Sequence, residues 1–478
     1  MTFESLGMTS YDSYDPLQLY SSADPHEFLY TLKKDKLLGI VPELKHERVR
    51  FSASVFTQKA TSAKNTNEQT VMLGDMLGLW NMLALTYDHC PTTTTLTPNL
   101  KEASLTSFGS TVGTTFSTID NPNGELLFGQ ENSLTFTNVS ELIGPHFGMV
   151  SAPLEYKKSG ARFEASILIF NDVGARIQGG FSEIQQSLTS TGTQVGFIDR
   201  SADNLLDGIL TPQNLNAVQE NLSKVNRVLD DSDKVIAIAN ELGLDVSDFR
   251  KSGFEDIRGS IFWRHAIPFN HDRDGWPKFL LTPFVQLYGC LATGAERDPF
   301  KQFSVSFGSN GHDSIGFNAG VSIDFEDTLE LAVEAGGTAF SSETQTIRLP
   351  THLNQRGILP CTASANVSPG NNWHFIATFN AKRFIDKLSG FAQFIQIAHN
   401  KDRIHLVNQP PCPDPTSCPP LLPFVIEEIS QWNWRMFTLA LNYEIAPSIS
   451  LGAIYQGPLS RKNAPRTKTI LGSLVVTF

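Results

Sequence analysis

The sequence predicts an all-β fold in which about 12 antiparallel strands close into a transmembrane β-barrel. Three observations lead to this prediction. The composition, with 33 Phe, 35 Gly and only 18% charged residues among 478, favours many strands and tight turns. Successive segments of about ten residues alternate between apolar and polar positions, as barrel strands do. Their connections are alternately short and long, which is typical of a barrel with two different ends.

Composition also excludes several classes of protein. A stretch of about 18 apolar residues without polar interruptions is absent from the sequence, so transmembrane helices are not expected. The formal net charge of −12 argues against nucleic acid as a partner. Five Cys without CxxC spacing do not form a zinc motif, and no cofactor or metal is expected; Cys412 and Cys418 lie close enough for a short-loop disulfide. The amino-terminus has no basic region followed by an apolar region, so no secretory signal is visible.

Twelve segments carry the strand pattern. In 314–325, for example, Ile315, Phe317 and every second residue onward are apolar, while the intervening residues are small or polar. Twelve is an even number, as a closed antiparallel barrel with both termini at one end requires. Residues 61–160 form either one long loop or an extra strand pair, which leaves 14 strands as the alternative. The predicted strands are 48–56, 161–169, 175–181, 257–267, 278–289, 314–325, 328–340, 373–381, 390–400, 435–445, 449–457 and 467–478.

The connections separate a barrel from a β-sandwich, which would produce the same alternation. Short turns are predicted near 171, 326, 385 and 447, and long loops at 342–371 and 401–431. A sandwich has no reason to sort its connections in this way, whereas outer-membrane barrels have short turns at one end and long external loops at the other.

Two segments fall outside the strand pattern. Residues 1–45 form an N-terminal extension or plug-like segment, and 46–478 form the barrel. Within the barrel, a helical insertion is predicted at 205–250. Thr211 and Pro212 are a suitable helix start, and Leu215, Val218 and Leu222 follow at helical spacing.

The last residues, LGSLVVTF, place Phe478 at the end of an alternating strand with Val476 and Leu474 on the same face. This pattern resembles the carboxyl-terminal signature of bacterial outer-membrane β-barrel proteins, which their barrel assembly machinery reads. The resemblance implies a Gram-negative outer-membrane location, with lipid and that machinery as partners. Aromatic side chains near strand ends are expected to form interfacial girdles: Trp373, Phe384, Trp432, Trp434, Tyr443 and Tyr455.

If the apolar faces contact lipid, the opposite faces line a lumen. The candidate pore-lining residues place basic charge on the earlier strands and acidic charge on the later ones. Similarity to general porins, which carry such a transverse field, implies passive diffusion of small hydrophilic solutes. The other interpretation is that the charges pair across a packed, narrow lumen. The candidates are Arg50, Arg162, Glu164, Arg176, Arg258, Arg264, Asp324, Glu330, Glu334, Lys382 and Glu444.

Other functions stay open. A hydrophobic-substrate transporter of the fatty-acid type would use an amino-terminal plug, and a surface adhesin or structural barrel would act through its loops. The irregular alternation around Gln393 and Gln396 leaves room for a homo-oligomer. An enzyme is not expected, because neither His265 nor the run from His312 to Ser314 lies in a recognisable catalytic motif.

Overall fold

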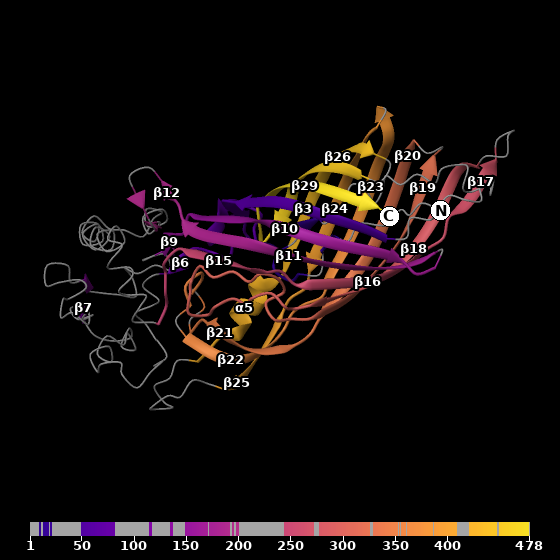
Figure 1. Cartoon of the computed structure of the whole chain (residues 1–478). Helices are drawn as coiled ribbons and strands as arrows, with labels where there is room; N and C mark the ends of the chain where they lie inside the picture. The colour runs from indigo at the N-terminus through magenta and orange to yellow at the C-terminus, as the bar shows by residue number, and fades with distance from the viewer. Residues whose placement is uncertain are drawn as a thin grey trace.

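The computed structural model describes most of the predicted barrel and parts of its loops (Figure 1). The described ranges are 9–10, 13–18, 20–21, 49–81, 114–116, 134–136, 149–170, 172–191, 194–195, 197–199, 243–271, 277–325, 328–351, 353, 355–359, 361–385, 387–408, 420–446 and 449–477.

Twelve strand positions form a closed antiparallel barrel. In chain order the strands are β3 (Val49–Ala60), β10 (Leu154–Leu168), β11 (Val173–Leu188), β16 (Ile257–Arg264), β18 (Pro277–Leu291), β19 (Ser314–Phe325), β20 (Leu329–Phe340), β23 (Asn372–Ile385), β24 (Leu388–His399), β26 (Trp432–Ala446), β27 (Ile449–Lys462) and β29 (Lys468–Thr477).

The first and last of these strands close the barrel. β29 pairs with β3 from Lys468↔Lys59 to Thr477↔Arg50, and β3 pairs in turn with β10. The position of β16 is extended by two further strands, β15 (Phe249–Phe254), which pairs with β11, and β17 (Ile267–His271), which pairs with β18. Closure leaves no free sheet edge in the barrel wall, so the strand backbones satisfy one another's hydrogen bonds without water.

Side chains alternate between an exposed apolar outer face and a buried inner face. On β3, Phe51 and Val55 are 51% and 65% exposed, whereas Arg50, the residue before Phe51, is 8% exposed. On β19 the outward residues run from Ile315 to Phe325 in steps of two, as predicted. A protein in water would bury such a belt of apolar side chains, so its exposure indicates a surface made for the lipid interior.

The strand predictions are confirmed. All twelve predicted segments overlap the twelve barrel strands, and the alternative of 14 is wrong because β3 pairs directly with β10. The four predicted short turns all lie at one end of the barrel, which is called the short-turn end below. The opposite end is the long-loop end.

The long loops have structure of their own that the sequence did not predict. β21 (Glu343–Leu349), β22 (Cys361–Ser368) and β25 (Arg403–Asn408) form a three-stranded sheet, against which α5 (Pro423–Ser430) packs. These elements lie toward the long-loop end, away from β17 (Figure 1). Shorter elements are β1 (Thr9–Ser10), β2 (Tyr20–Ser21), β4 (Ser62–Lys64), β5 (Thr70–Met72), η2 (Leu73–Asp75), β6 (Trp80–Asn81), β7 (Thr114–Phe116), β8 (Leu134–Phe136), β9 (Met149–Ser151), β12 (Ser190–Thr191), β13 (Gln194–Val195), β14 (Ile198–Asp199) and β28 (Ala464–Pro465).

Several sequence predictions fall on residues outside the described ranges. Most of the predicted helical insertion, 205–242, lies there, while its last two residues belong to β15. Phe478, Cys412 and Cys418 also lie outside the described residues; Cys361 on β22 is disulfide-bonded, and Cys290 on β18 is a buried thiol. In the part of the chain that the structure describes, no helix is long and apolar enough to cross a membrane.

Candidate functional site: the barrel lumen

The inner face of the barrel carries the candidate residues. Arg50, Arg162, Glu164, Arg176, Arg258, Arg264, Asp324 and Glu330 are all buried, at 2–8% exposure, and Glu334 and Glu444 are half-buried at positions in phase with them. Lys382 lies on β23, but its side chain is outside the described part of the structure. Their role as pore lining stays a prediction; their burial indicates that the lumen is narrow in this conformation.

The basic candidates gather on neighbouring strands. Glu164 forms an ion pair with Arg176 on β11, in which Glu164 Oε1 lies 3.2 Å from Arg176 Nε. The guanidinium carbons of Arg176 and Arg264 each lie 6.0 Å from the ring centroid of Phe262, which points inward between them. Together with Arg50 on β3, these side chains make the lumen wall at the short-turn half of β3, β10, β11 and β16 positive.

A buried ion network, unpredicted from the sequence, lies in the same wall. Glu255, between β15 and β16, accepts hydrogen bonds from Arg162 (Nε to Oε2, 2.6 Å) and Lys158 (Nζ to Oε1, 2.7 Å). All three side chains are at most 3% exposed. Gly180 makes room for the network, because a Cβ at that position would lie 2.7 Å from a Glu255 carboxylate oxygen. Lys158 shares the inward phase of Arg162, but it falls in the stretch predicted as loop.

Three of the acidic candidates, Asp324, Glu330 and Glu334, lie on β19 and β20, whereas Glu444 lies on β26. Asp324 and Glu330 are directly opposite each other in the register. Asn318 donates a hydrogen bond to Glu334 (Nδ2 to Oε2, 2.9 Å), and Asn380 donates one to Glu330 (Nδ2 to Oε2, 3.4 Å). These three carboxylates lie on strands other than those of the basic cluster, and a transverse field across the lumen stays a prediction.

A third sector of the inner face carries apolar side chains beside polar ones such as Gln393, Thr438 and Gln456, and is called the apolar sector below. Its apolar side chains project inward from β3, β23, β24, β26, β27 and β29 and form two buried clusters. The members are Ile376, Ile395, Ile397, Trp432, Trp434, Met436 and Ala464 in one, and Phe56, Phe391, Ala440, Ile454 and Leu471 in the other.

This sector corrects one prediction and explains another. Trp432 and Trp434 were expected in the outer aromatic girdle, but they point inward and are 4% and 2% exposed, whereas Trp373 and Tyr443 are exposed outside as predicted. On β24, Phe391, Ile395 and Ile397 lie on the inner face beside the polar Gln393, whereas Gln396 lies on the outer face, so the alternation is irregular on both faces.

Residues Ser13–Gln18, called the N-terminal turn below, lie across the mouth at the long-loop end. Asn372 at the start of β23 donates to the Ser13 carbonyl (2.9 Å), and Trp432 Nε1 donates to the Tyr14 carbonyl (3.0 Å). On β10, Lys158 Nζ donates to Gln18 Oε1 (2.7 Å). Since β10 and β23 lie half-way around the barrel from each other, the turn spans the mouth from wall to wall.

The turn holds itself in shape through local hydrogen bonds. The Asp15 carboxylate accepts from the Leu17 amide (2.8 Å), and the Asp15 carbonyl accepts from the Gln18 amide (2.9 Å). Burial raises the pKa of Asp15 above its ordinary value, although this amide, Arg297 and Lys158 act in the opposite direction. Burial also raises the pKa of the Tyr14 hydroxyl, which therefore stays neutral.

An apolar core next to the turn covers more of the mouth. It joins residues from the loops and from the long-loop ends of β3, β10 and β11, and Leu17 of the N-terminal turn packs against it. Its largest fully buried members include Tyr156, Phe303 and Phe307. The long-loop end therefore has a packed cover rather than open loops.

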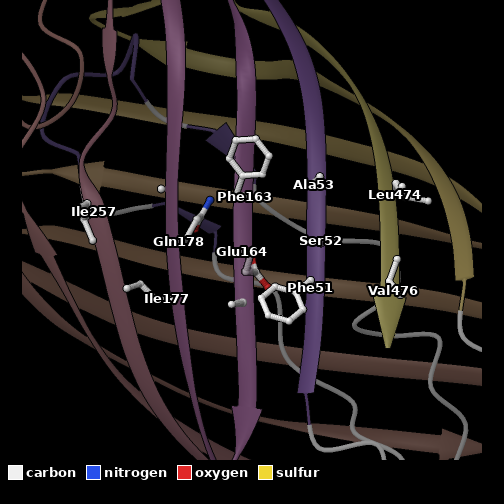
Figure 2. Close-up of a pocket in the computed structure, with 12 residues that line it drawn as sticks. Phe51, Ser52, Ala53, Phe163, Glu164, Ile177, Gln178, Ile257, Leu474 and Val476 are labelled. Atoms are coloured by element: carbon white, nitrogen blue, oxygen red, sulfur yellow. The ribbon is translucent and has the colours of Figure 1, made fainter. Parts of the chain in front are cut away.

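The membrane-facing side carries a separate apolar groove of about 450 Å³, shown in Figure 2. Phe51, Phe163 and Ile257 border it, and small residues form its floor, among them Ala53 and Gly179. The groove is a depression in the belt that contacts lipid and lies outside the lumen, so it belongs to the barrel's lipid contact surface.

The closed wall, the exposed apolar belt and the short-turn and long-loop ends identify the chain as a bacterial outer-membrane β-barrel. No protein-family model and no curated protein matches it.

Among solved structures, the chain is similar to the COG4313 outer membrane channel of Pseudomonas putida F1, with 6% sequence identity, a TM-score of 0.44, and 91% of this chain and 97% of that chain covered. It is also similar to the NanC porin (8% identity, TM-score 0.29, coverage 67% and 93%) and to a FadL homologue of Pseudomonas aeruginosa (9% identity, TM-score 0.26, coverage 91% and 90%). At these identities the likeness extends to the fold alone, and the membrane location follows from the barrel's own geometry.

Proposed function

We propose that this protein is an outer-membrane channel for the passive diffusion of small hydrophilic solutes, held closed at the long-loop end by the N-terminal turn. The observation that carries the proposal is the contrast between the two faces of the wall. On β19 the inward residues are Ser314, Gly316, Asn318, Gly320, Ser322 and Asp324, while every outward residue is apolar. A polar inner face replaces part of the water that a hydrophilic solute loses on entering.

The charged sectors supply the selectivity in this proposal. A basic wall on β3, β10, β11 and β16 and acidic residues on β19 and β20 produce a field across the lumen. A polar solute aligns its dipole in such a field, and an ion is drawn toward one wall. Because the N-terminal turn and the apolar core beside it cover the long-loop end, passage requires the turn to move.

Single-channel recording in a planar bilayer tests the proposal. The refolded protein should show brief ohmic openings, and replacing Arg50, Arg176 and Arg264 together by Gln should shift the reversal potential in a salt gradient toward cation preference. Arg435→Gln is the matched control, because Arg435 is exposed on the outer face. An unchanged reversal potential would show that these arginines do not line the conduction path.

The apolar sector favours a second candidate, a transporter of hydrophobic substrates. A stripe of inward Ile, Trp and Phe side chains is unusual in a lumen built only for water-soluble solutes. Vesicles that swell in arabinose after insertion of the protein favour the first function; uptake of a fluorescent long-chain fatty acid without swelling favours the second. Enzymatic inactivity, homo-oligomers and action through the loops stay predictions.

A further inference from the structure

The ring of Tyr14 fills a pocket in the covered mouth, here called the Tyr14 pocket and defined by Asn310, His312, Phe340, His399 and Trp432. The ring meets His312 edge-on at 5.2 Å between centroids, and the rings of Phe340 and His399 lie 6.2 and 6.3 Å away. The Asn310 side chain faces the Tyr14 hydroxyl and lowers its pKa, against the larger effect of burial. The pocket therefore holds a flat ring among aromatic side chains and meets its hydroxyl with an amide.

Hydrogen bonds that do not involve Tyr14 fix two of the pocket walls, His399 and His312. His399 has Asn372 Oδ1 2.7 Å from Nδ1 and Asp402 Oδ1 2.9 Å from Nε2, and it stacks on Trp432 with 10° between the ring planes. His312 Nδ1 lies 2.9 Å from the Ser341 carbonyl and Nε2 2.8 Å from Gln345 Nε2.

The His312 contacts define its protonation. A carbonyl can only accept and an amide NH₂ can only donate, so Nδ1 carries the proton and Nε2 is the acceptor. Burial lowers the pKa of His312, in agreement with a neutral ring. Walls that are held by their own partners persist when the occupant leaves, as in most small-molecule sites.

Tyr14 is the part of the N-terminal turn that anchors it. Among the described residues, the turn has two further hydrogen bonds at this side of the mouth, both to its backbone carbonyls, from Asn372 to Ser13 and from Trp432 to Tyr14. Backbone carbonyls occur at every residue and give no sequence specificity, whereas a buried aromatic ring is the commonest source of binding free energy at an interface.

We propose that the Tyr14 pocket is a recognition site for small phenols, and that a phenol entering it displaces Tyr14 and releases the N-terminal turn. This inference rests on the proposed channel function and adds to it a ligand class and a means of opening. The pocket selects a planar ring through its aromatic walls and a hydroxyl through Asn310. Tyr14 acts as a tethered ligand at an effective concentration on the order of millimolar, so a free phenol competes in that range.

The experiment measures the time that single channels spend open while p-cresol is added, with toluene as the matched compound without a hydroxyl. In the intact protein, p-cresol should raise the open time with a half-maximal effect on the order of millimolar, and toluene should have less effect. Asn310→Gly should remove the difference, since Asn310 has a φ of 48° that Gly adopts without strain.

Two further variants separate ligand recognition from channel function. Tyr14→Ala should be open without ligand, with an open time roughly thirtyfold longer than that of the intact protein, because one anchor residue is lost. A chain lacking residues 1–45 should also be open without ligand. The deletion variant should not respond to p-cresol, because its mouth is already released.

Equal effects of p-cresol and toluene, or a p-cresol effect that persists in the deletion variant, would mean membrane perturbation and overturn the inference. If both variants conduct and p-cresol leaves the intact protein unchanged, the recognition site fails while the channel stands. If all variants are silent, the channel fails, and calorimetric titration of Tyr14→Ala with p-cresol then decides the site: binding that Asn310→Gly abolishes supports it, and no binding refutes it.

Discussion

Glu255 is the residue whose removal should destabilise the barrel most directly. It accepts hydrogen bonds from Lys158 and Arg162 where all three side chains are buried. Glu255→Gln leaves two buried cations without their carboxylate, which costs about 3–5 kcal/mol of unfolding free energy. Urea unfolding, followed by the loss of the folded band on a detergent gel, measures this change.

The control is Glu183→Gln. Glu183 pairs with Arg250, whose side chain is 70% exposed, and an ion pair of this kind contributes at most about 1 kcal/mol. Equal effects of the two substitutions would show that the Glu255 network does not stabilise the wall.

Asp15 makes closure of the mouth depend on pH. Its carboxyl has a raised pKa in the docked turn, so it holds its proton more tightly there than in water. The docked turn is therefore favoured as the pH falls through the raised pKa and loses that contribution as the pH rises above it. Open time should decrease from neutral pH toward the ordinary carboxyl range.

Asp15→Asn keeps an oxygen for the Leu17 amide but carries no charge, so this variant should be more closed at neutral pH and should lose the Asp15 part of the pH dependence. His312, with its lowered pKa, acts in the opposite direction, and the difference between the intact protein and the variant removes its contribution. A variant with the same pH profile as the intact protein would exclude Asp15.

At the scale of the strand, the outer face should reject charge according to depth. Leu439 lies outward in the middle part of β26, and Trp373 lies outward near the end of β23. Leu439→Arg should destabilise the folded barrel by about 2–4 kcal/mol and Trp373→Arg by about 0–1 kcal/mol. Refolding titrations in lipid vesicles measure both, and a larger effect at Trp373 would contradict the assigned membrane belt.

The strands and the inward phase of the charged candidates other than Lys382 could be predicted, because both depend on a local period of two. The same pattern could not show which lumen positions are apolar. Trp432 and Trp434 at a strand end look alike in sequence whether they face lipid or lumen, and only the phase of β26 separates these cases. Glu255 lies at a break between β15 and β16, where no period applies, and the position of Tyr14 depends on contacts with residues more than 290 positions away.

The whole molecule should show the gel migration and the assembly behaviour of an outer-membrane barrel. Heating should change the migration of the folded protein on a detergent gel, because the closed sheet resists unfolding by detergent alone. Deleting Phe478 should reduce the amount of folded barrel in the outer membrane, as the resemblance to the assembly signature implies. Unchanged migration together with solubility in the absence of detergent would contradict a membrane barrel.

The central claim is that a polar lumen is closed by the N-terminal turn. The swelling rate of arabinose-loaded liposomes tests it most directly, measured once with the intact protein and once with the chain lacking residues 1–45. We expect slow swelling with the intact protein and a clear increase with the deletion, for equal amounts of folded barrel on the gel. Equal slow rates would contradict it, because they would mean that the packed charges inside the barrel, and not the turn, block the passage of hydrophilic solutes.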